Sequence, residues 1–211
     1  AVARLSKAIN TQEKILIYGD YDVDGTSAVS LLYRHLRGHT SLLYTYIPDR
    51  YTEGYGISFQ GIDYAASKGC SLIIALDCGI KAIDKVQYAS NKGIDFIIGD
   101  HHRPDAQVPD AVAILNPQQA DCPYPYKELC GCGIGFKLVQ AYQQHLSRPF
   151  EEIRPLLDLV AIATAADIVA MNGENRTLTY FGLEVINQQP SAGVSALLGE
   201  TQKGVVISDV V

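Results

Sequence analysis

Short apolar segments separated by enough chain for a helix constrain the fold more than any other feature of this sequence. Four of them are rich in Ile, Leu, Val and Tyr and cover 14–19, 42–47, 71–76 and 95–99, and a fifth candidate covers 111–115. The chain between the first four has room for helices at 26–37, 58–68 and 82–92. Strands that are apolar at nearly every position are covered on both faces. We therefore predict an α/β fold, a doubly wound parallel sheet of about five strands flanked by helices.

The pattern changes after Gly133. Helical spacing covers 136–145, 150–166 and 178–187, and the next strand signal is 205–207. Because no linker rich in Gly, Ser or Pro divides the two parts, we predict a helical C-terminal part within one domain, residues 1–211. The last residues, 205–211, hold no turn or cap, so we expect the chain to stop inside an element.

Composition excludes several classes of protein. With 47% hydrophobic and 19% charged residues, the chain of 211 residues can form a sizeable core and is not intrinsically disordered. No apolar run reaches the roughly 18–20 residues of a membrane span, and no basic start precedes an apolar export signal. We therefore expect a cytoplasmic protein without membrane partners. A net charge of −6 argues against binding nucleic acid by bulk electrostatics.

The five cysteines suggest neither a disulfide framework nor a zinc site. Their number is odd, and Cys122, Cys130 and Cys132 lack the C-x-x-C spacing of zinc ligands. We expect reduced thiols.

Aspartates directly follow three of the predicted strands. Asp20 follows the first strand, Asp77 the third and Asp100 the fourth. Parallel strands end at the same edge of a sheet, where open α/β folds bind their ligands. Each aspartate alone is explained as a helix cap or turn residue. Together we expect them to meet in space, where they repel one another unless a proton or a metal ion holds them.

The first of these aspartates begins the run D-Y-D-V-D-G, residues 20–25. We predict that its alternating carboxylates project to one side of an extended chain, and that Gly25 lets the chain turn into the next helix. Oxygen ligands at this spacing suit hard divalent cations. A calcium-binding EF-hand is excluded, because Leu31 stands where its loop requires a glutamate.

The fourth strand leads into Asp100, His101 and His102. Neighbouring histidines point in different directions, so one can bind a metal while the other faces a substrate, with Asp100 holding a ring N–H. Histidine mixed with aspartate favours Mn²⁺ over Mg²⁺ or Ca²⁺. Two such ions about 3.5–4 Å apart would suit the displacement of a phosphoester.

The order of these motifs resembles that of the DHH phosphoesterase superfamily. The matching motifs are D-Y-D-V-D-G at 20–25, D-C-G at 77–79 and D-H-H at 100–102. Within the superfamily, the chain resembles the RecJ family of single-stranded-DNA-specific exonucleases. This closer likeness lies in 48–50, 54–56, 116–117, 122–125, 129–133, 136–137 and 157–169.

The resemblance implies a metal centre that holds one or two Mn²⁺ ions, with Mg²⁺ as a substitute. The implied metal ligands are Asp22, Asp24, Asp77, His101 and Asp167, with Asp77 bridging two ions and Asp158 as the alternative to Asp167. The catalytic residues would be Asp77, His101 and His102, supported by Asp20, Asp100 and Asp158. Many members of the superfamily carry a histidine where this chain has Tyr18, which implies one nitrogen ligand fewer for the first ion.

The resemblance also implies how a substrate would be held. His102 would contact the scissile phosphate, and Arg50 and Tyr55 would bind the strand. Tyr21 and Tyr51 are further candidates for base stacking. Arg103, Lys127 and Lys137 are candidate phosphate contacts because they lie near the motifs, although each is also explained as a solvated charge.

The implied function is that of a metal-dependent phosphodiesterase that degrades single-stranded DNA in the 5′→3′ direction in recombination and repair. One alternative is a DHH-family phosphatase or oligoribonuclease acting on small nucleotides or pyrophosphate, and another is a non-catalytic replication scaffold on the same fold. Complete RecJ-family enzymes also carry a DHH-associated domain and an oligonucleotide-binding fold. We therefore expect this chain to be the catalytic domain, cut before those domains. The implied partners are single-stranded DNA, the missing C-terminal domains, and a single-strand-binding protein or helicase.

Overall fold

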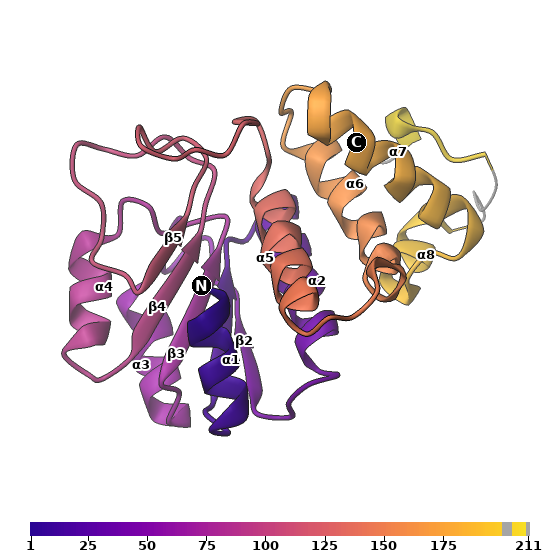
Figure 1. Ribbon diagram of the computed structural model, residues 1–211. Coiled ribbons are helices and arrows are strands. Elements are labelled where there is room, and N and C mark those ends of the chain that lie inside the picture. The colour runs from indigo at the N-terminus through magenta and orange to yellow at the C-terminus, as the bar shows by residue number, and fades with distance from the viewer. Residues whose placement is uncertain (200–203, 210–211) are drawn as a thin grey trace.

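The computed structural model describes residues 1–199 and 204–209, and its centre is a five-stranded sheet in the order β2-β1-β3-β4-β5 (Figure 1). The strands are β1 (Ile15–Gly19), β2 (Leu43–Tyr46), β3 (Leu72–Leu76), β4 (Asp95–Gly99) and β5 (Ala113–Leu115). Every neighbouring pair runs parallel. The predicted α/β fold is therefore confirmed, and each strand lies within its predicted range.

Helices cover both faces of the sheet. The helices of the first face are α1 (Val2–Asn10), α2 (Val23–Leu36) and α5 (Gly131–His145), and those of the second are α3 (Phe59–Lys68) and α4 (Ile83–Ser90). Ile15 and Ile17 of β1 join the core of the first face, whereas Leu16 and Tyr18 join the core of the second. Successive side chains of a strand point to opposite faces, so every position of β1 is buried.

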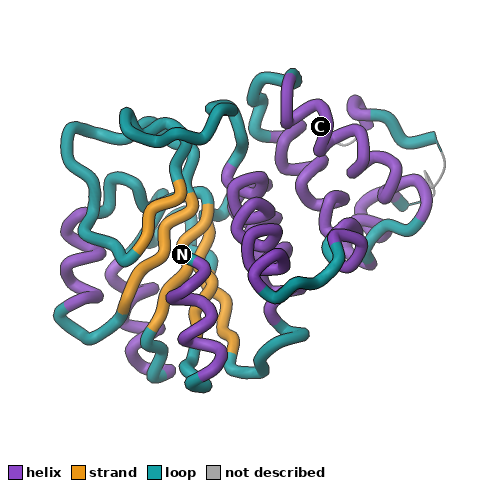
Figure 2. Tube along the Cα trace, viewed as in Figure 1, coloured by secondary structure: helices purple, strands orange, loops and turns teal. Residues whose placement is uncertain are grey.

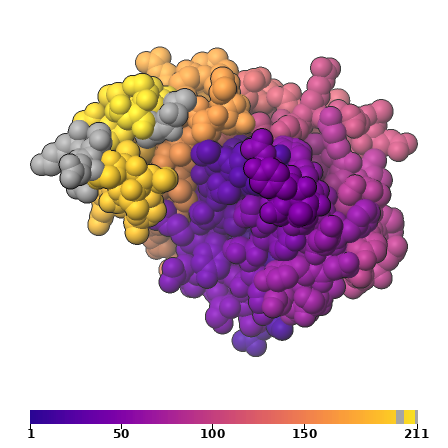
Figure 3. All heavy atoms as spheres, turned by 180° about the vertical axis from the view of Figure 1, so that it is seen from behind, coloured from indigo at the N-terminus to yellow at the C-terminus, as the bar shows by residue number. Residues whose placement is uncertain are grey.

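The helical C-terminal part packs beside the sheet rather than on it. It comprises α6 (Leu157–Ala166), α7 (Gly173–Gln188) and α8 (Ala192–Leu198). α6 packs against α2 and α5, and α7 packs against α6. This part therefore forms the orange and yellow lobe at one side of the molecule (Figures 1 and 3). One hydrophobic cluster still runs from the first face of the sheet into α6 and α7.

Two predictions for the C-terminal part need correction. The helix expected over 150–166 begins only at Leu157, because Pro155 has no N–H to continue a helix. Two 3-10 helices, Phe150–Glu152 and Arg154–Leu156, precede it. The strand expected over 205–207 is wrong. Val205 bonds to the side chain of Asn187 through both its N–H and its carbonyl, and Ile207–Asp209 is a 3-10 helix. The expected end inside an element lies partly outside the described residues.

The start of α2 also differs from the expectation. The helix begins at Val23, so Asp24 and Gly25 lie in its first turn and not in an extended chain. Gly25 is needed for close packing and not for a turn, because a Cβ atom there would lie 2.5 Å from the backbone nitrogen of Asp20. The sequence analysis also missed α1 and α8, which are short and bury few side chains.

The strand order places a topological switch point between β1 and β3. The connection after β1 leads outward to β2, and the chain then returns to form β3 on the other side of β1. Ligands of doubly wound sheets bind outside the carboxyl ends of the strands at such a point. Long loops gather at this edge of the sheet (Figure 2). Among the described helices, none is long and apolar enough to cross a bilayer.

Candidate metal centre

Asp77 lies at the centre of the candidate site. It directly follows β3, and its backbone takes the left-handed conformation with a φ of +61°, which is uncommon for a residue with a side chain. The side chain is buried, and neither carboxylate oxygen accepts a hydrogen bond from the described part of the chain. Burial of an unpartnered carboxylate is costly, so the fold presents Asp77 at the expense of its own stability.

Asp24 is fixed by the N-terminus of α5. Its two oxygens accept hydrogen bonds from the backbone N–H groups of Gly131 at 2.6 Å and Cys132 at 2.7 Å. The first N–H groups of a helix have no carbonyl partner within that helix, and the helix dipole favours an anion there. The contact joins residues 107 positions apart in the chain. The N-terminus of α5 therefore orients one carboxylate of the site.

Gly131 also makes room for Asp77. A Cβ atom at Gly131 would lie 2.5 Å from the Cβ and 2.6 Å from the Oδ1 of Asp77. Real Cβ atoms do not approach other atoms so closely, so a larger residue would have to displace Asp77 or α5. One glycine thus lets a helix terminus bind Asp24 while it touches Asp77.

His101 connects three carboxylates. Its Nε2 lies 3.2 Å from Oδ1 of Asp77, 3.6 Å from Oδ2 of Asp167 and 3.9 Å from Oδ2 of Asp24. Asp167 is the residue at which α6 ends, so the helical part supplies one carboxylate to a site built by the sheet. Asp24, His101 and Asp167 each have a donor atom within 4.8 Å of the others, and so do Asp77, His101 and His102.

Burial and mutual repulsion raise the pKa values of these carboxyl groups. The pKa of Asp77 lies well above its usual value, first because the group is buried and then because Asp24 and Asp22 lie near it. Burial likewise raises the pKa of Asp24, and it raises that of Asp167 to about 6. Among the described residues, the only ion-pair partner of Asp24, Asp77 and Asp167 is His101. No Lys or Arg of the described residues therefore offsets the charge of these carboxylates.

Asp22 and Asp20 lie at the rim of this cluster. Asp22 is the N-cap of α2 and accepts the N–H of Gly25 at 2.9 Å. It is exposed and belongs to neither group of converging donors, although it is near enough to raise the pKa of Asp77. Asp20 is fully buried, and its Oδ1 accepts the N–H of Tyr21 at 2.7 Å. Of the predicted metal ligands, Asp22 is thus the one that is exposed to solvent and lies outside both groups of converging donor atoms.

His102 begins a series of contacts that leads away from the carboxylates. Asp100 accepts hydrogen bonds from the backbone N–H and the ring Nδ1 of His102, and the second bond raises the pKa of His102. The hydroxyl of Tyr55 lies 2.9 Å from Nε2 of the same ring. The ring of Tyr55 meets that of Tyr21 edge-on, and the Arg50 guanidinium lies over Tyr21 at 5.3 Å. The predicted substrate contacts His102, Tyr55 and Arg50 therefore line one continuous strip.

The structure brings Asp167 to the cluster and leaves Asp158 outside it. Asp158 is fully buried in the first turn of α6, where it accepts the N–H groups of Leu159 at 2.7 Å and Ser191 at 2.9 Å. It also pairs with Arg34 at 3.4 Å. These contacts tie α6 to α2 and to the start of α8, so the burial of Asp158 has a structural explanation.

Tyr18 also has a structural explanation. Its hydroxyl donates to the carbonyl oxygen of Gly56 at 2.9 Å and accepts the N–H of Ser58 at 3.0 Å. The ring stacks on Tyr46 in the core of the second face, and burial raises its pKa. Tyr18 therefore fixes the loop that carries Tyr55, and its hydroxyl is used there and not at the carboxylates.

Several other predicted contacts lie apart from the cluster. Lys127 donates to the carbonyl oxygen of Cys122 at 2.7 Å, and Lys137 pairs with Glu174 at 2.9 Å. Tyr51 is almost fully exposed. All five cysteines are free, as expected. Local structure therefore accounts for both lysines.

The donor atoms present fit a divalent metal ion. Both oxygens of Asp77, Nε2 of His101 and Oδ2 of Asp167 are buried and have no hydrogen-bond partner among the described residues. Carboxylate oxygens combined with one imidazole nitrogen are the donors that Mn²⁺ and similar ions take. A cation would also relieve the repulsion within the cluster, which no Lys or Arg of the described residues does.

Sequence analysis missed the part that the N-terminus of α5 plays. A signal was present, because the G-C-G-I-G run at 131–135 places glycines where a helix normally avoids them. The sequence does not show that this helix terminus faces Asp24, since that depends on how α2 packs against α5.

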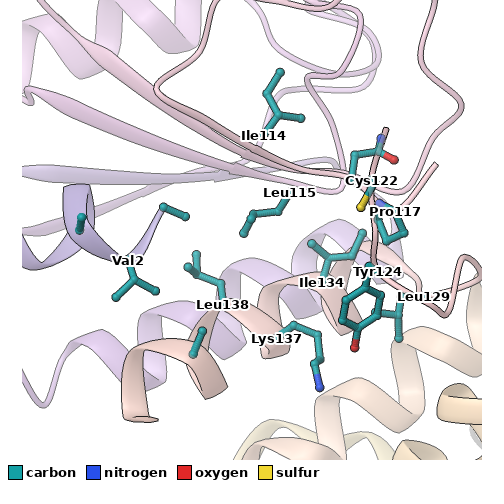
Figure 4. Close-up of a pocket in the computed structure, with 14 residues that line it drawn as sticks. Val2, Ile114, Leu115, Pro117, Cys122, Tyr124, Leu129, Ile134, Lys137 and Leu138 are labelled. Carbon is teal, nitrogen blue, oxygen red and sulfur yellow. The ribbon is translucent and has the colours of Figure 1, made fainter. Parts of the chain in front are cut away.

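A separate apolar hollow of about 520 Å³ lies between α1, β5 and α5. Figure 4 shows Val2, Ile114 and Leu138 around it, with the ammonium group of Lys137 directed away. The lining is predominantly apolar and holds no cluster of carboxylates or histidines. The candidate chemistry of the described residues is therefore at the carboxyl edge of the sheet.

Comparison with known proteins agrees with this arrangement. Residues 14–164 match the family model of the DHH family, N-terminal domain. The chain is 43% identical over 198 residues to the single-stranded-DNA-specific exonuclease RecJ of Bacillus subtilis, covering 94% of this chain and 24% of that protein. It is 37% identical over 210 residues to RecJ of Escherichia coli, covering 94% of this chain and 36% of that protein.

A solved structure shows the same fold. The crystal structure of exonuclease RecJ bound to manganese superimposes with a TM-score of 0.90 at 27% identity, covering 99% of this chain and 53% of that one. The chain thus spans 24% to 36% of the length of the two RecJ proteins to which it is similar. Its fold, its motifs and the family model together show that this chain belongs to the DHH family and contains that family's N-terminal domain.

Proposed function

We propose that the protein containing this chain is a metal-dependent phosphodiesterase that degrades single-stranded DNA from its 5′ end in recombination and repair. The observation that carries the proposal is the group of buried, unpartnered donor atoms on Asp77, His101 and Asp167 at the switch point of the sheet. The similarity to RecJ proteins supports the choice of substrate. The direction of degradation rests on that similarity alone.

In this proposal Asp24, Asp77, His101 and Asp167 hold a divalent cation, and Asp22 joins them from the N-cap of α2. The cation would be Mn²⁺, with Mg²⁺ as a substitute, and Asp77 would be among the residues that hold each ion if two bind. The RecJ structure bound to manganese supports this choice of metal. When bound, the metal would supply Lewis-acid stabilisation of the charge that develops on the phosphate oxygens.

The chain's own residues would bind and orient the strand. Asp100 binds Nδ1 of His102 and raises the pKa of this ring, and the protonated ring would donate from Nε2 to an oxygen of the scissile phosphate once the Tyr55 hydroxyl gives way. Tyr55 is exposed and would stack on a base, and the half-buried Tyr21 supports its ring edge-on. Stacking of this kind tolerates any sequence. Arg50 lies at the end of this strip and would bind a further phosphate.

The proposal extends to the whole protein. Residues 1–211 would form its catalytic domain in the cytoplasm, followed by a DHH-associated domain and an oligonucleotide-binding fold. Those domains would provide the rest of the DNA-binding surface, because this chain carries a net charge of −6. A single-strand-binding protein or a helicase is the partner that would deliver single strands to it.

The proposal is tested with the full-length protein and single-stranded DNA labelled at either end. We expect mononucleotides to be released first from the 5′ end in Mn²⁺, and no release in EDTA. Hydrolysis of dinucleotides or pyrophosphate in preference to long strands would instead support a small-substrate phosphatase. Absence of both hydrolysis and Mn²⁺ binding would support a non-catalytic scaffold.

A further inference from the structure

A second hollow, of about 610 Å³, opens directly beside His102. Its walls come from the loop before α3, from the connection between β3 and α4, and from the residues after β4. Tyr55 and His102, whose side chains touch each other, belong to both this hollow and the strip that leads to Arg50. The hollow therefore adjoins the candidate substrate path at Tyr55 and His102.

The charge of this hollow differs from that of the molecule as a whole. Lys81, Lys85 and Arg103 line it, whereas its only lining carboxylate, Asp100, is buried and already bound to His102. Lys81 pairs with Asp105 at 3.5 Å, but both side chains are more than half exposed, so this contact contributes little energy. Arg103 forms no ion pair with any residue that the structure describes. Lys85 pairs with Asp84 at 3.0 Å, but the Asp84 side chain is also more than half exposed, so an anion in the hollow can compete for these cations.

The floor of the hollow is apolar. Ile57, Cys78 and Ile80 line it and are almost completely buried. A free phosphate needs only the cations, whereas a nucleotide also offers a sugar and a base with apolar surface to cover such a floor. The combination of a cationic rim, an apolar floor and the adjoining Tyr55 ring favours a nucleotide unit over an inorganic anion.

We propose that the hollow lined by Lys81, Lys85 and Arg103 is a nucleotide subsite that binds the unit of single-stranded DNA adjacent to the scissile phosphate. This inference rests on the proposed function and adds a second group of cations to that of Arg50. Both groups of cations adjoin the strip that contains His102, so the strand would be held at two places near the bond that breaks. Holding at two places orients the phosphate without requiring the chain to be basic overall.

The subsite is tested in the full-length protein with the double variant Lys81→Gln/Lys85→Gln. Arg103 is left unchanged because it adjoins His102. The control is Lys68→Gln/Lys92→Gln, which removes the same charge from the distal ends of α3 and α4, where each lysine also lies over a tyrosine ring. Equilibrium binding of a short oligothymidylate is measured in EDTA over a range of salt concentrations, and hydrolysis is measured separately in Mn²⁺.

We expect the Lys81/Lys85 variant to bind the strand about tenfold more weakly than the control. The slope of log binding constant against log salt concentration should be smaller in magnitude by about 1.4, because two phosphate contacts at about 0.7 each are lost. KM should rise by a similar factor, while kcat stays within about twofold because the metal centre is unchanged. Equal affinity and equal slope in the variant and the control would overturn the subsite. If the wild-type protein binds the strand through these lysines but does not hydrolyse it, the subsite stands and the proposed function fails.

Discussion

The two edges of the sheet differ in whether their carboxylates are paired with a cationic side chain. At the amino edge, Arg4 of α1 pairs with Glu13 at 2.6 Å and with Asp95 at 2.6 Å, and Ser71 also bonds to Glu13. At the carboxyl edge, Asp24, Asp77 and Asp167 find only His101 among the described residues. The same fold thus pairs its carboxylates with an arginine at one edge, whereas at the other edge no described Lys or Arg pairs with Asp24, Asp77 or Asp167.

The pKa values record the same contrast. Burial acts to raise the pKa of Glu13, but hydrogen bonds from Ser71 and Arg4 outweigh it and hold that pKa below its usual value. Burial raises the pKa of Asp77, and here the neighbouring carboxylates raise it further. The comparison shows that a sheet edge can be built for stability or for binding a cation. In this chain the first task falls to the amino edge and the second to the carboxyl edge.

Replacing Asp77 by Asn should have the largest effect. The full-length variant should lose at least about 10³-fold in single-strand hydrolysis, equivalent to about 4 kcal/mol of barrier, because a central metal ligand is gone. Its metal-free melting temperature should not fall, because one unpartnered charge is removed. The rise in melting temperature that Mn²⁺ gives the wild type should disappear. These are measured by hydrolysis rates and by thermal unfolding with Mn²⁺ and with EDTA.

Asp95→Asn is the matched control, because this aspartate begins a strand at the opposite edge of the sheet. It should keep its response to Mn²⁺ and its activity. Hydrolysis by Asp77→Asn within tenfold of the wild type would refute the central position of Asp77.

Replacing Arg4 by Met tests the amino edge. The side chain of Arg4 is only 9% exposed and that of Glu13 18%, so the change leaves Glu13 without the cation that it pairs with. We expect the free energy of unfolding to fall by about 2 kcal/mol, less than the cost of breaking a fully buried pair because Asp95 is well solvated. Denaturant unfolding at neutral pH measures this.

The control for Arg4 is Arg148→Met, which breaks the exposed pair with Glu152. It should change stability by less than about 0.5 kcal/mol. Mn²⁺ affinity should be the same in both variants. If Arg4→Met loses Mn²⁺ binding at temperatures where the variant is folded, the amino edge does affect the metal centre, and the two edges do not act independently.

Gly131→Ala sharpens the comparison by disturbing the carboxyl edge without changing its charge. The added Cβ would meet Asp77, so we expect Mn²⁺ affinity, measured by calorimetry, to fall at least about tenfold, the scale of effect for residues that orient metal ligands. Gly133→Ala is the control in the same helix, because a Cβ there meets its neighbours at no less than 3.4 Å. Equal Mn²⁺ affinity in the two variants would show that Gly131 does not position Asp77.

The loss of stability on protonation of His35 should be the smallest of these effects. It contributes to any pH dependence of the free energy of unfolding and is separate from the carboxylates at the two edges. Burial and then the nearby His39 lower the pKa of His35 from 6.5 to about 4. The folded state therefore binds fewer protons than the unfolded state between these values, and stability falls as the pH drops through that window. Since His35 is partly exposed, we expect a loss of only about 1 kcal/mol.

Replacing His35 by Gln should remove this loss. The free energy of unfolding is measured for both proteins at pH 7 and pH 4.5. Between these values it should fall further in the wild type than in the variant. Parallel pH profiles for the two proteins would place the acid response elsewhere.

The strands of the sheet and the edge at which the site lies could both be predicted from the amino-acid sequence. Apolar runs predicted the strands, and an aspartate after β1, β3 and β4 predicted that carboxylates meet at the carboxyl edge. Both inferences depend on local periodicity and on the rule that parallel strands end together, which need no knowledge of packing.

How the residues of the site are held could not be predicted, because it depends on the packing of helices against one another. The tertiary structure placed Asp24 in a helix against the amides of Gly131 and Cys132, brought Asp167 rather than Asp158 to His101, and used Tyr18 to fix a loop. These outcomes depend on how α2, α5 and α6 cross one another. A hydrogen bond between residues 107 positions apart leaves no periodic trace in the sequence, because its partners are set by the packing of whole helices and not by their neighbours in the chain.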